Sequence, residues 1–89
     1  MISKDDKKKI SDISKKYKVK KVLLFGSSLS SESDVGDIDL AVEGVASGQF
    51  FEFCGELLLG LSKPVDVVDL SKKSRFTDFI SRRGVVIYE

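Results

Sequence analysis

Four short segments rich in β-forming residues, separated by segments with helical periodicity, constrain the fold of this chain more than any other feature. Each run has the length and the β-forming residues of a strand. The runs cover residues 19–25, 37–43, 65–70 and 85–88. Helical patterns cover residues 4–17, 49–61 and 74–83. This order predicts an α+β fold, with one mixed β-sheet of about four strands and helices packed mainly on one face.

The length and the rare residues limit the chemistry. A chain of 89 residues is expected to form a single domain, residues 1–89, with a thin core. It contains one cysteine and no histidine, which excludes a Cys/His zinc site and a Ser-His-Asp triad. A catalytic metal would therefore have oxygen ligands, which favours Mg²⁺, with Mn²⁺ as a substitute.

The hydropathy pattern predicts no membrane association. No run approaches the roughly 20 apolar residues that a membrane-spanning helix needs. The first six residues, MISKDD, lack the apolar core of a signal peptide. We therefore expect a cytoplasmic protein.

Charge is distributed unevenly along the chain. Residues 1–21 contain nine lysines and three aspartates, whereas residues 22–89 contain six basic and eleven acidic residues. A basic segment beside an acidic body is consistent with nucleic-acid binding through Lys7, Lys8 and Lys9. The alternative is a solvated, lysine-rich helix, and the sequence leaves both open.

Each helical pattern has an apolar stripe that is expected to face the core. The stripe of residues 4–17 is Ile10, Ile13 and Tyr17. The stripe of residues 49–61 consists of Phe50, Phe53, Cys54, Leu57, Leu58 and Leu61. In residues 74–83 the stripe is Phe76, Phe79 and Ile80, and Gly84 is the expected C-terminal cap.

The middle helix has a second apolar stripe, formed by Phe51, Gly55 and Leu59. One stripe is enough to pack a helix on a sheet, so the second is surplus. It is either a contact surface for a protein partner or a second copy of the chain, or it is buried beneath the terminal segments.

Residues 37–43, DIDLAVE, alternate between apolar and polar positions. Ile38, Leu40 and Val42 should face the core, while Asp37 and Asp39 share the open face about 6.5–7 Å apart along the strand. Two carboxylates at this spacing repel each other and favour a bound cation. This pair is a candidate Mg²⁺ site.

A third carboxylate from the next strand would complete such a site. Asp66 and Asp69 both lie on the run 65–70, and Asp66, at the strand entry, is our choice. Upstream, Gly26 ends the first strand and permits close approach of a ligand to the backbone. The Ser27 hydroxyl and the backbone N–H groups that follow, from Ser28 onward, are candidate phosphate ligands.

Taken together, these motifs resemble a known signature. Phe25-Gly26-Ser27, nine residues, and then Asp37-Ile38-Asp39 resemble the polymerase-beta-like nucleotidyltransferase superfamily. The similarity is greatest to its minimal (MNT) branch, which includes antitoxins paired with HEPN toxins. The strand containing Asp66 and the ending FISRRGVVIYE resemble the corresponding family segments, so nearly the whole chain is covered.

The resemblance implies an enzyme that transfers a nucleotidyl group, AMP in the first instance, from ATP or another nucleoside triphosphate to a hydroxyl of a partner macromolecule. It implies that Gly26, Ser27 and Ser28 bind the nucleotide. It also implies that Asp37, Asp39 and Asp66 are catalytic and hold Mg²⁺, with two ions possible. The implied partner is a HEPN-type toxin, for which this chain would be the antitoxin.

Two departures from the family pattern keep an alternative open. Many members have ten residues between the serine and the first aspartate, and many have an arginine shortly after the serine, where this chain has Ser28, Leu29, Ser30 and Ser31. The alternative functions are a catalytically inactive module of the same fold that neutralises a partner by contact, and a nucleic-acid-binding subunit.

Overall fold

The computed structural model describes residues 2–26 and 37–89 and shows an α+β fold with one mixed sheet. Its helices are α1 (Lys4–Lys16), the short 3-10 helix η2 (Ser47–Gln49), α2 (Phe50–Gly60) and α3 (Arg75–Arg83). Its strands are β1 (Lys21–Leu24), β2 (Ile38–Glu43), β3 (Val65–Asp69) and β4 (Val85–Tyr88). Every strand and helix expected within the described residues is therefore confirmed, with ends that differ by a few residues.

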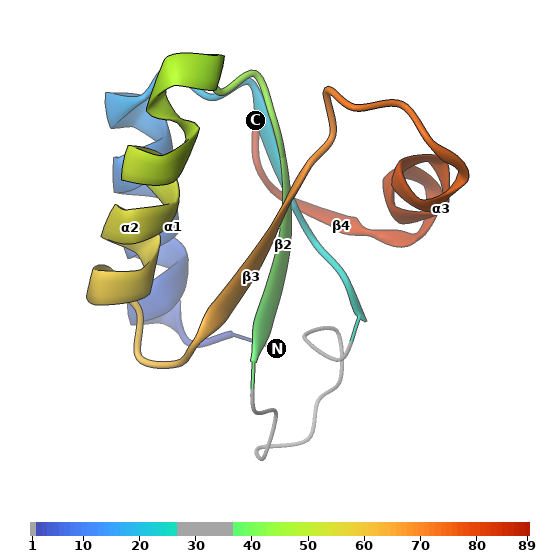
Figure 1. The fold of residues 1–89 in the computed structure, drawn as a ribbon. Coiled ribbons are helices and arrows are strands. Elements are labelled where there is room, and N and C mark those ends of the chain that lie inside the picture. Colours follow the sequence, from blue (N-terminus) through green and yellow to red (C-terminus); the bar gives the residue numbers. More distant parts are fainter. Residues whose placement is uncertain (1, 27–36) are drawn as a thin grey trace.

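The sheet has the strand order β3-β2-β1-β4. β1 is antiparallel to both β2 and β4, whereas β2 and β3 are parallel. The parallel pair is possible because α2 crosses over between the two strands. Helices α1 and α2 cover one face of the sheet, and α3 lies alone on the other face (Figure 1). The expectation of helices mainly on one face is confirmed.

The larger core lies between the sheet and the helices α1 and α2. The alternation predicted for β2 holds, because Ile38, Leu40 and Val42 are all buried in this core. Ile10 of α1 and Phe53 and Leu57 of α2 are fully buried against them. Leu58, predicted to belong to the core stripe, is 58% exposed, and that assignment is wrong. It lies one residue beyond Leu57, where the helix has already turned away from the sheet.

The helix α1 buries polar side chains that its apolar stripe does not reveal. Asp6 and Ser14 are buried together with Ile10, on the same helical face. The Asp6 carboxylate accepts hydrogen bonds from the backbone N–H of Ser62, at 3.1 Å, and from its hydroxyl, at 2.5 Å. This contact joins the first turn of α1 to the segment that follows α2.

A smaller core lies beneath α3. It consists of Leu23, Ala41, Leu70 and Ile80, with Phe25 and Val68 packed against it. The stripe predicted for α3 is correct for Ile80 and wrong for its two phenylalanines. Phe76 and Phe79 are 56% and 58% exposed, and Thr77 is buried beside Ile80 instead.

Thr77 tolerates burial because its polar atoms are satisfied within a capping box. Its backbone N–H donates to the Ser74 hydroxyl, and the Ser74 backbone N–H donates to the Thr77 hydroxyl. Gly84 caps the other end of α3, as predicted, and donates its N–H to the Ile80 carbonyl. A Cβ at Gly84 would lie 2.9 Å from that carbonyl oxygen and 3.2 Å from Leu23 Cβ, so close packing requires the glycine here.

Candidate functional site

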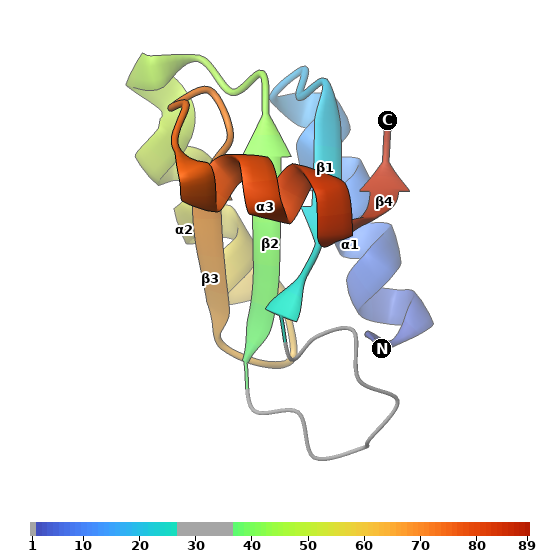
Figure 2. The same cartoon turned by 90° about the vertical axis from the view of Figure 1, so that its right-hand side faces the viewer.

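The candidate site lies at the end of the sheet where β2 and β3 begin and β1 ends. Helix α3 crosses the same face nearer the opposite end, so it leaves these strand termini uncovered (Figure 2). Asp39 follows the first residue of β2, and Asp66 follows the first residue of β3. Both positions alternate with residues of the larger core, so their side chains point to the α3 side of the sheet.

The parallel pairing of β2 and β3 brings Asp39 and Asp66 side by side. The two residues are Cα partners in the register of these strands. Neighbouring strands are about 4.8 Å apart, so two carboxylates on the same face lie close together. The register is supported at its start by a 2.8 Å hydrogen bond from the Ile38 N–H to the Pro64 carbonyl. Asp66 is exposed and Asp39 is half-buried.

Asp69, the other acidic residue of β3, lies at the opposite end of the strand. Its carboxylate accepts hydrogen bonds from the backbone N–H and the hydroxyl of Ser71, at 2.9 and 2.7 Å. Asp69 also contributes to the raised pKa of the Cys54 thiol, whose main cause is burial. Cys54 belongs to α2, so the Asp69 side chain lies on the face of the sheet that α1 and α2 cover, opposite α3 (Figure 1). The geometry therefore pairs Asp66, and not Asp69, with Asp39.

Gly26 occupies the corner beside Asp39. The Phe25 N–H donates to the Asp39 carbonyl at 3.1 Å, which ties this corner to β2. Gly26 has φ +64°, in the left-handed region, and an added Cβ would lie 2.6 Å from Asp39 Oδ2. A side chain at position 26 would thus displace the Asp39 carboxylate. The absence of a Cβ leaves backbone and carboxylate in direct proximity, as a site for a metal-associated phosphate requires.

The remaining predicted site residues are placed as follows. Asp37 is exposed and directly precedes β2. Ser27 and Ser28 lie outside the described residues. Within the part of the chain that the structure describes, no group of three His, Cys, Asp or Glu side chains is gathered closely enough to hold a metal ion. Asp39, Asp66 and Gly26 are therefore the site residues that the fold brings together.

The donor chemistry of these residues fits a hard divalent cation. Carboxylate oxygens are the protein ligands that Mg²⁺ prefers, and one or two carboxylates with substrate phosphates form its usual site. Asp39 and Asp66 supply two carboxylates from adjacent strands, and Gly26 keeps the space next to Asp39 open. A rigid sheet holds both residues, which favours a defined ligand geometry.

The basic α1 segment lies on the far side of the sheet from this site. Lys7, Lys8 and Lys9 are exposed, and α1 packs with α2 against the larger core. Phe51 and Leu59 of α2 are 88% and 89% exposed, and nothing lies within 4 Å of a Cβ built at Gly55. Burial of the second α2 stripe under the terminal segments is therefore not found among residues 2–26 and 37–89. No helix in these residues has the length and apolar character to cross a bilayer.

Comparison with known proteins identifies the family to which this fold belongs. The family described as "Polymerase beta, Nucleotidyltransferase" matches residues 8–89. No curated protein matches the chain. Among solved structures, a toxin–antitoxin complex with AMP-PNP matches with a TM-score of 0.73 and 26% identity, over 91% of this chain and 71% of the other.

Two further structures share the fold. The MntA-HepT toxin–antitoxin matches with a TM-score of 0.68 and 24% identity, over 92% of this chain and 68% of the other. A complex of tri-AMPylated Shewanella oneidensis HEPN toxin with MNT antitoxin gives the same TM-score, identity and coverage. With a family match across residues 8–89 and the paired strands that present Asp39 and Asp66 beside Gly26, this chain belongs to the polymerase beta nucleotidyltransferase family, as a minimal nucleotidyltransferase domain.

Proposed function

We propose that this chain, as a single cytoplasmic domain, transfers an AMP group from ATP, or another nucleotidyl group from its triphosphate, to a hydroxyl of a HEPN-type toxin, and so acts as its antitoxin. The observation that carries the proposal is the pairing of Asp39 with Asp66 beside Gly26. It is supported by the fold shared with an AMP-PNP complex and with the MNT partner of a tri-AMPylated HEPN toxin.

The residues have distinct parts in this proposal. Asp39 and Asp66, which the strand register pairs, would hold one or two Mg²⁺ ions, or Mn²⁺ in their place, and Asp37 would be a further ligand. When bound, the metal would neutralise charge on the triphosphate and would favour loss of the proton from the acceptor hydroxyl. Gly26 gives the phosphates access to the backbone, and Ser27 and Ser28 donate hydrogen bonds to phosphate oxygens. Asp66, more exposed than Asp39, is placed nearer the acceptor, where its carboxylate accepts the hydroxyl proton or orients the hydroxyl.

Positioning supplies most of the rate in this scheme. Transfer of a phosphorus-centred group needs little covalent chemistry from the protein, so alignment of acceptor and phosphate and neutralisation of charge dominate. The two parallel strands hold Asp39 and Asp66 at a set separation through backbone hydrogen bonds. Loss of either carboxylate should therefore lower the rate much more than it lowers stability.

The test is transfer of labelled ATP to a purified HEPN partner in the presence of Mg²⁺. Asp39→Asn should lower the rate by roughly a hundredfold or more, as is typical when one charge-stabilising group is removed from an active site. Asp69→Asn is the matched control, because it removes a carboxylate from the same strand as Asp66 but at its other end. Unchanged transfer by Asp39→Asn, or an equal loss in both variants, would refute the proposed role.

A second function is favoured by the exposed stripe of α2. Phe51 and Leu59 form an apolar surface that a partner would cover. If contact alone neutralises the toxin, neutralisation should survive the double variant Asp37→Ala with Asp39→Ala. If transfer is required, the double variant should bind the toxin and leave it active. Titration of ATP with and without Mg²⁺ shows directly whether the nucleotide site is functional.

A further inference from the structure

The positive charge of an otherwise acidic body is concentrated in α3 and in the segment that leads into it. Five of the six basic residues of the range 22–89 lie between residues 72 and 83. They are Lys72, Lys73, Arg75, Arg82 and Arg83. Asp78 is the one acidic residue in that interval, so the interval has a net charge of +4. Such a local excess attracts polyanions even when the net charge of the chain is near zero.

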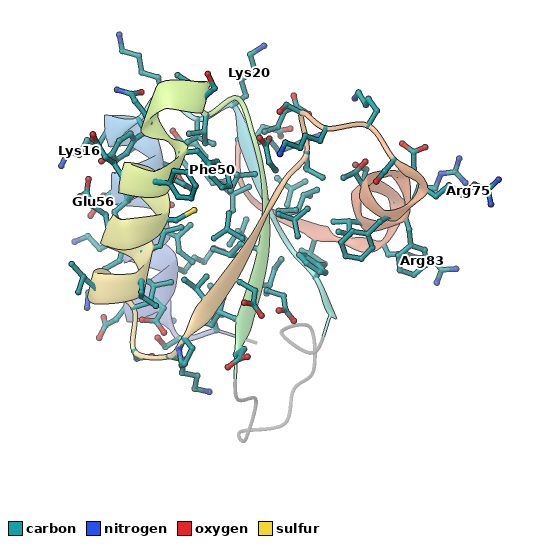
Figure 3. All side chains as sticks on the ribbon, viewed as in Figure 1. Lys16, Lys20, Phe50, Glu56, Arg75 and Arg83 are labelled. Atoms are coloured by element: carbon teal, nitrogen blue, oxygen red, sulfur yellow. The ribbon has the colours of Figure 1, made fainter. Side chains whose placement is uncertain are left out.

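The exposed surface of α3 contains a hollow. It has a volume of about 380 Å³ and is lined by residues of α3 alone. The lining residues are Arg75, Asp78, Phe79, Arg82 and Arg83. Their spacing of three and four residues places them on one helical face. Figure 3 shows Arg75 and Arg83 projecting from α3 on the side away from α1 and α2.

The arginines of this surface are available to a ligand. Within residues 2–26 and 37–89 the ion pair formed is that of Lys16 with Glu56, on the opposite side of the sheet. None of the three guanidinium groups of α3 lies in an ion pair with a described carboxylate, although Asp78 is three residues from Arg75 and four from Arg82. Each guanidinium presents five N–H donors suited to phosphate oxygens.

Helix stability accounts for only part of this pattern. Arg82 and Arg83 lie in the last turn, where the helix dipole favours cations. Arg75 is the first residue of the helix, where the dipole disfavours a cation, so helix stability does not account for an arginine at this position. Phe76 and Phe79 are likewise more exposed than folding of a core helix requires.

The exposed rings of Phe76 and Phe79 lie among the arginines of α3. The Arg83 guanidinium carbon lies 5.5 Å from the centroid of the Phe79 ring. Phe76 meets Phe25 edge to face, with ring centroids 6.3 Å apart, and this contact fixes Phe76 next to the residue that precedes Gly26. Proteins that hold single strands combine cationic side chains, which contact phosphates, with aromatic rings, on which bases stack.

We propose that the α3 surface, formed by Arg75, Phe76, Phe79, Arg82 and Arg83, binds single-stranded nucleic acid. The arginines contact the phosphates, and the two phenylalanines stack with the bases. This surface differs from the lysine cluster of α1, which lies across the sheet and has three lysines in succession without an aromatic ring among them. A duplex binds less well, because its bases are already stacked and do not reach the rings.

The test is fluorescence anisotropy of the full chain with labelled single-stranded RNA and DNA of mixed sequence, and with a duplex of equal length. The triple variant Arg75→Gln, Arg82→Gln, Arg83→Gln should weaken single-strand binding by about tenfold or more. It should also reduce the slope of log affinity against log salt concentration by about 2, because each phosphate contact on a single strand contributes roughly 0.7 to that slope. The RNA and DNA arms show which strand is preferred.

Two comparisons separate this site from non-specific attraction. Lys7→Gln, Lys8→Gln, Lys9→Gln removes the same charge from α1 and should have a much smaller effect. Phe76→Leu with Phe79→Leu keeps apolar area, removes the rings and should weaken binding severalfold at unchanged salt slope. Circular dichroism confirms that each variant is folded. Asp39→Asn, which should lose transfer activity, should bind the single-stranded oligonucleotides with wild-type affinity, and this separates nucleic-acid binding from transfer.

Three results would overturn the proposal. The first is an equal loss in the lysine and arginine variants. The second is equal affinity for duplex and single strand with no effect of the Phe-to-Leu changes. The third is tighter binding of an acidic polypeptide such as polyglutamate than of either oligonucleotide, which would identify the surface as a protein-docking site.

Discussion

Gly26 combines two independent requirements at one residue. Its φ of +64° lies in the left-handed region, and its missing Cβ leaves Asp39 Oδ2 undisturbed. Gly44, at the other end of β2, has φ +95°, and a Cβ added there would lie 2.9 Å from the Lys20 backbone nitrogen. Both glycines therefore have a backbone conformation that would strain any other residue, and of the two Gly26 borders a candidate site residue.

Alanine at either glycine should lower the free energy of unfolding by about 1–3 kcal/mol, the usual range for a non-glycine residue held in a strained backbone region. Thermal or denaturant unfolding measures this loss. Gly26→Ala should in addition weaken Mg²⁺-dependent ATP binding, since its methyl group displaces the Asp39 carboxylate. Equal ATP affinity in Gly26→Ala and Gly44→Ala would show that the corner at Gly26 has no part in nucleotide binding.

Tyr17 and Glu56 form a titratable pair between α1 and α2. The Tyr17 hydroxyl donates a short hydrogen bond to the Glu56 carboxylate, which Lys16 also contacts at 3.0 Å. This hydrogen bond is the main reason that the pKa of Tyr17 rises from 10.0 to about 12, and burial and the negative charge of Glu56 act in the same direction. The same hydrogen bond lowers the pKa of Glu56.

The raised pKa makes a contribution to stability that depends on pH. A proton bound more tightly in the folded state stabilises the fold fully below the ordinary pKa of 10.0, and this contribution is lost as pH rises through about 12. We expect the stability of the wild type to fall more steeply between these values than that of Tyr17→Phe. Glu56→Gln should return the Tyr17 titration, followed by tyrosinate absorbance, toward its ordinary range.

The other tyrosine provides the control. The chain contains two tyrosines, so Tyr88→Phe leaves Tyr17 as the sole absorbing phenol. Its titration midpoint in that variant should lie near 12. A midpoint near 10 would contradict the hydrogen bond to Glu56.

At the scale of the element, α1 shows how a helix reconciles polar residues with a buried face. Asp6 is satisfied by Ser62, and the Ser3 hydroxyl caps the helix by accepting from the Asp6 N–H at 3.1 Å. Ser14 is fully buried, and its hydroxyl has no hydrogen-bond partner among the described residues. An unsatisfied buried hydroxyl opposes folding, whereas a satisfied buried carboxylate need not.

Ser14→Ala should therefore leave the free energy of unfolding unchanged or raise it by up to about 1 kcal/mol. The change removes an unpaired hydroxyl and introduces a better helix former. Asp6→Ala should destabilise it by about 2 kcal/mol, the usual value of hydrogen bonds to a charged group. Denaturant unfolding of both variants measures the contrast. A destabilised Ser14→Ala would mean that the hydroxyl is hydrogen-bonded in solution.

At the scale of the whole molecule, α2 has one face in the core and another in solvent. Leu57 is fully buried, while Leu59, two residues later, is 89% exposed together with Phe51. Exposed apolar side chains gathered on one helix are typical of a contact surface, whether for a partner protein or for a second copy of the chain.

Leu59→Lys should change stability by less than about 0.5 kcal/mol, because the side chain contributes little to the core. Leu57→Ala, two residues earlier in the same helix, should lower the free energy of unfolding by about 2–5 kcal/mol, because Leu57 is fully buried. Sedimentation and partner-binding measurements should show weaker association for Leu59→Lys at full stability. Association that is unaffected by a charge at Leu59 and by Phe51→Ser would exclude this stripe as the interface.

The sequence by itself determined the local features of this protein. The periodicities located α1, α2, α3 and the four strands, since they reflect alternation and helical repeat within a short window. They also placed Ile38, Leu40 and Val42 on the core face, opposite Asp39. The lack of histidine left oxygen as the expected ligand of any catalytic metal.

Only the tertiary structure decided what depends on packing between distant segments. The register that pairs Asp39 with Asp66 is set by strand hydrogen bonds across a crossover, which local periodicity does not encode. Likewise, the apolar stripe of α3 predicted three core residues, Phe76, Phe79 and Ile80. In the structure the capping box satisfies the polar atoms of Thr77, and α3 is oriented so that Thr77 is buried beside Ile80. Phe76 and Phe79 are left exposed. A helix buries the face that fits the sheet beneath it, and here Ile80 packs with Leu23, Ala41 and Leu70, with Phe25 and Val68 against them.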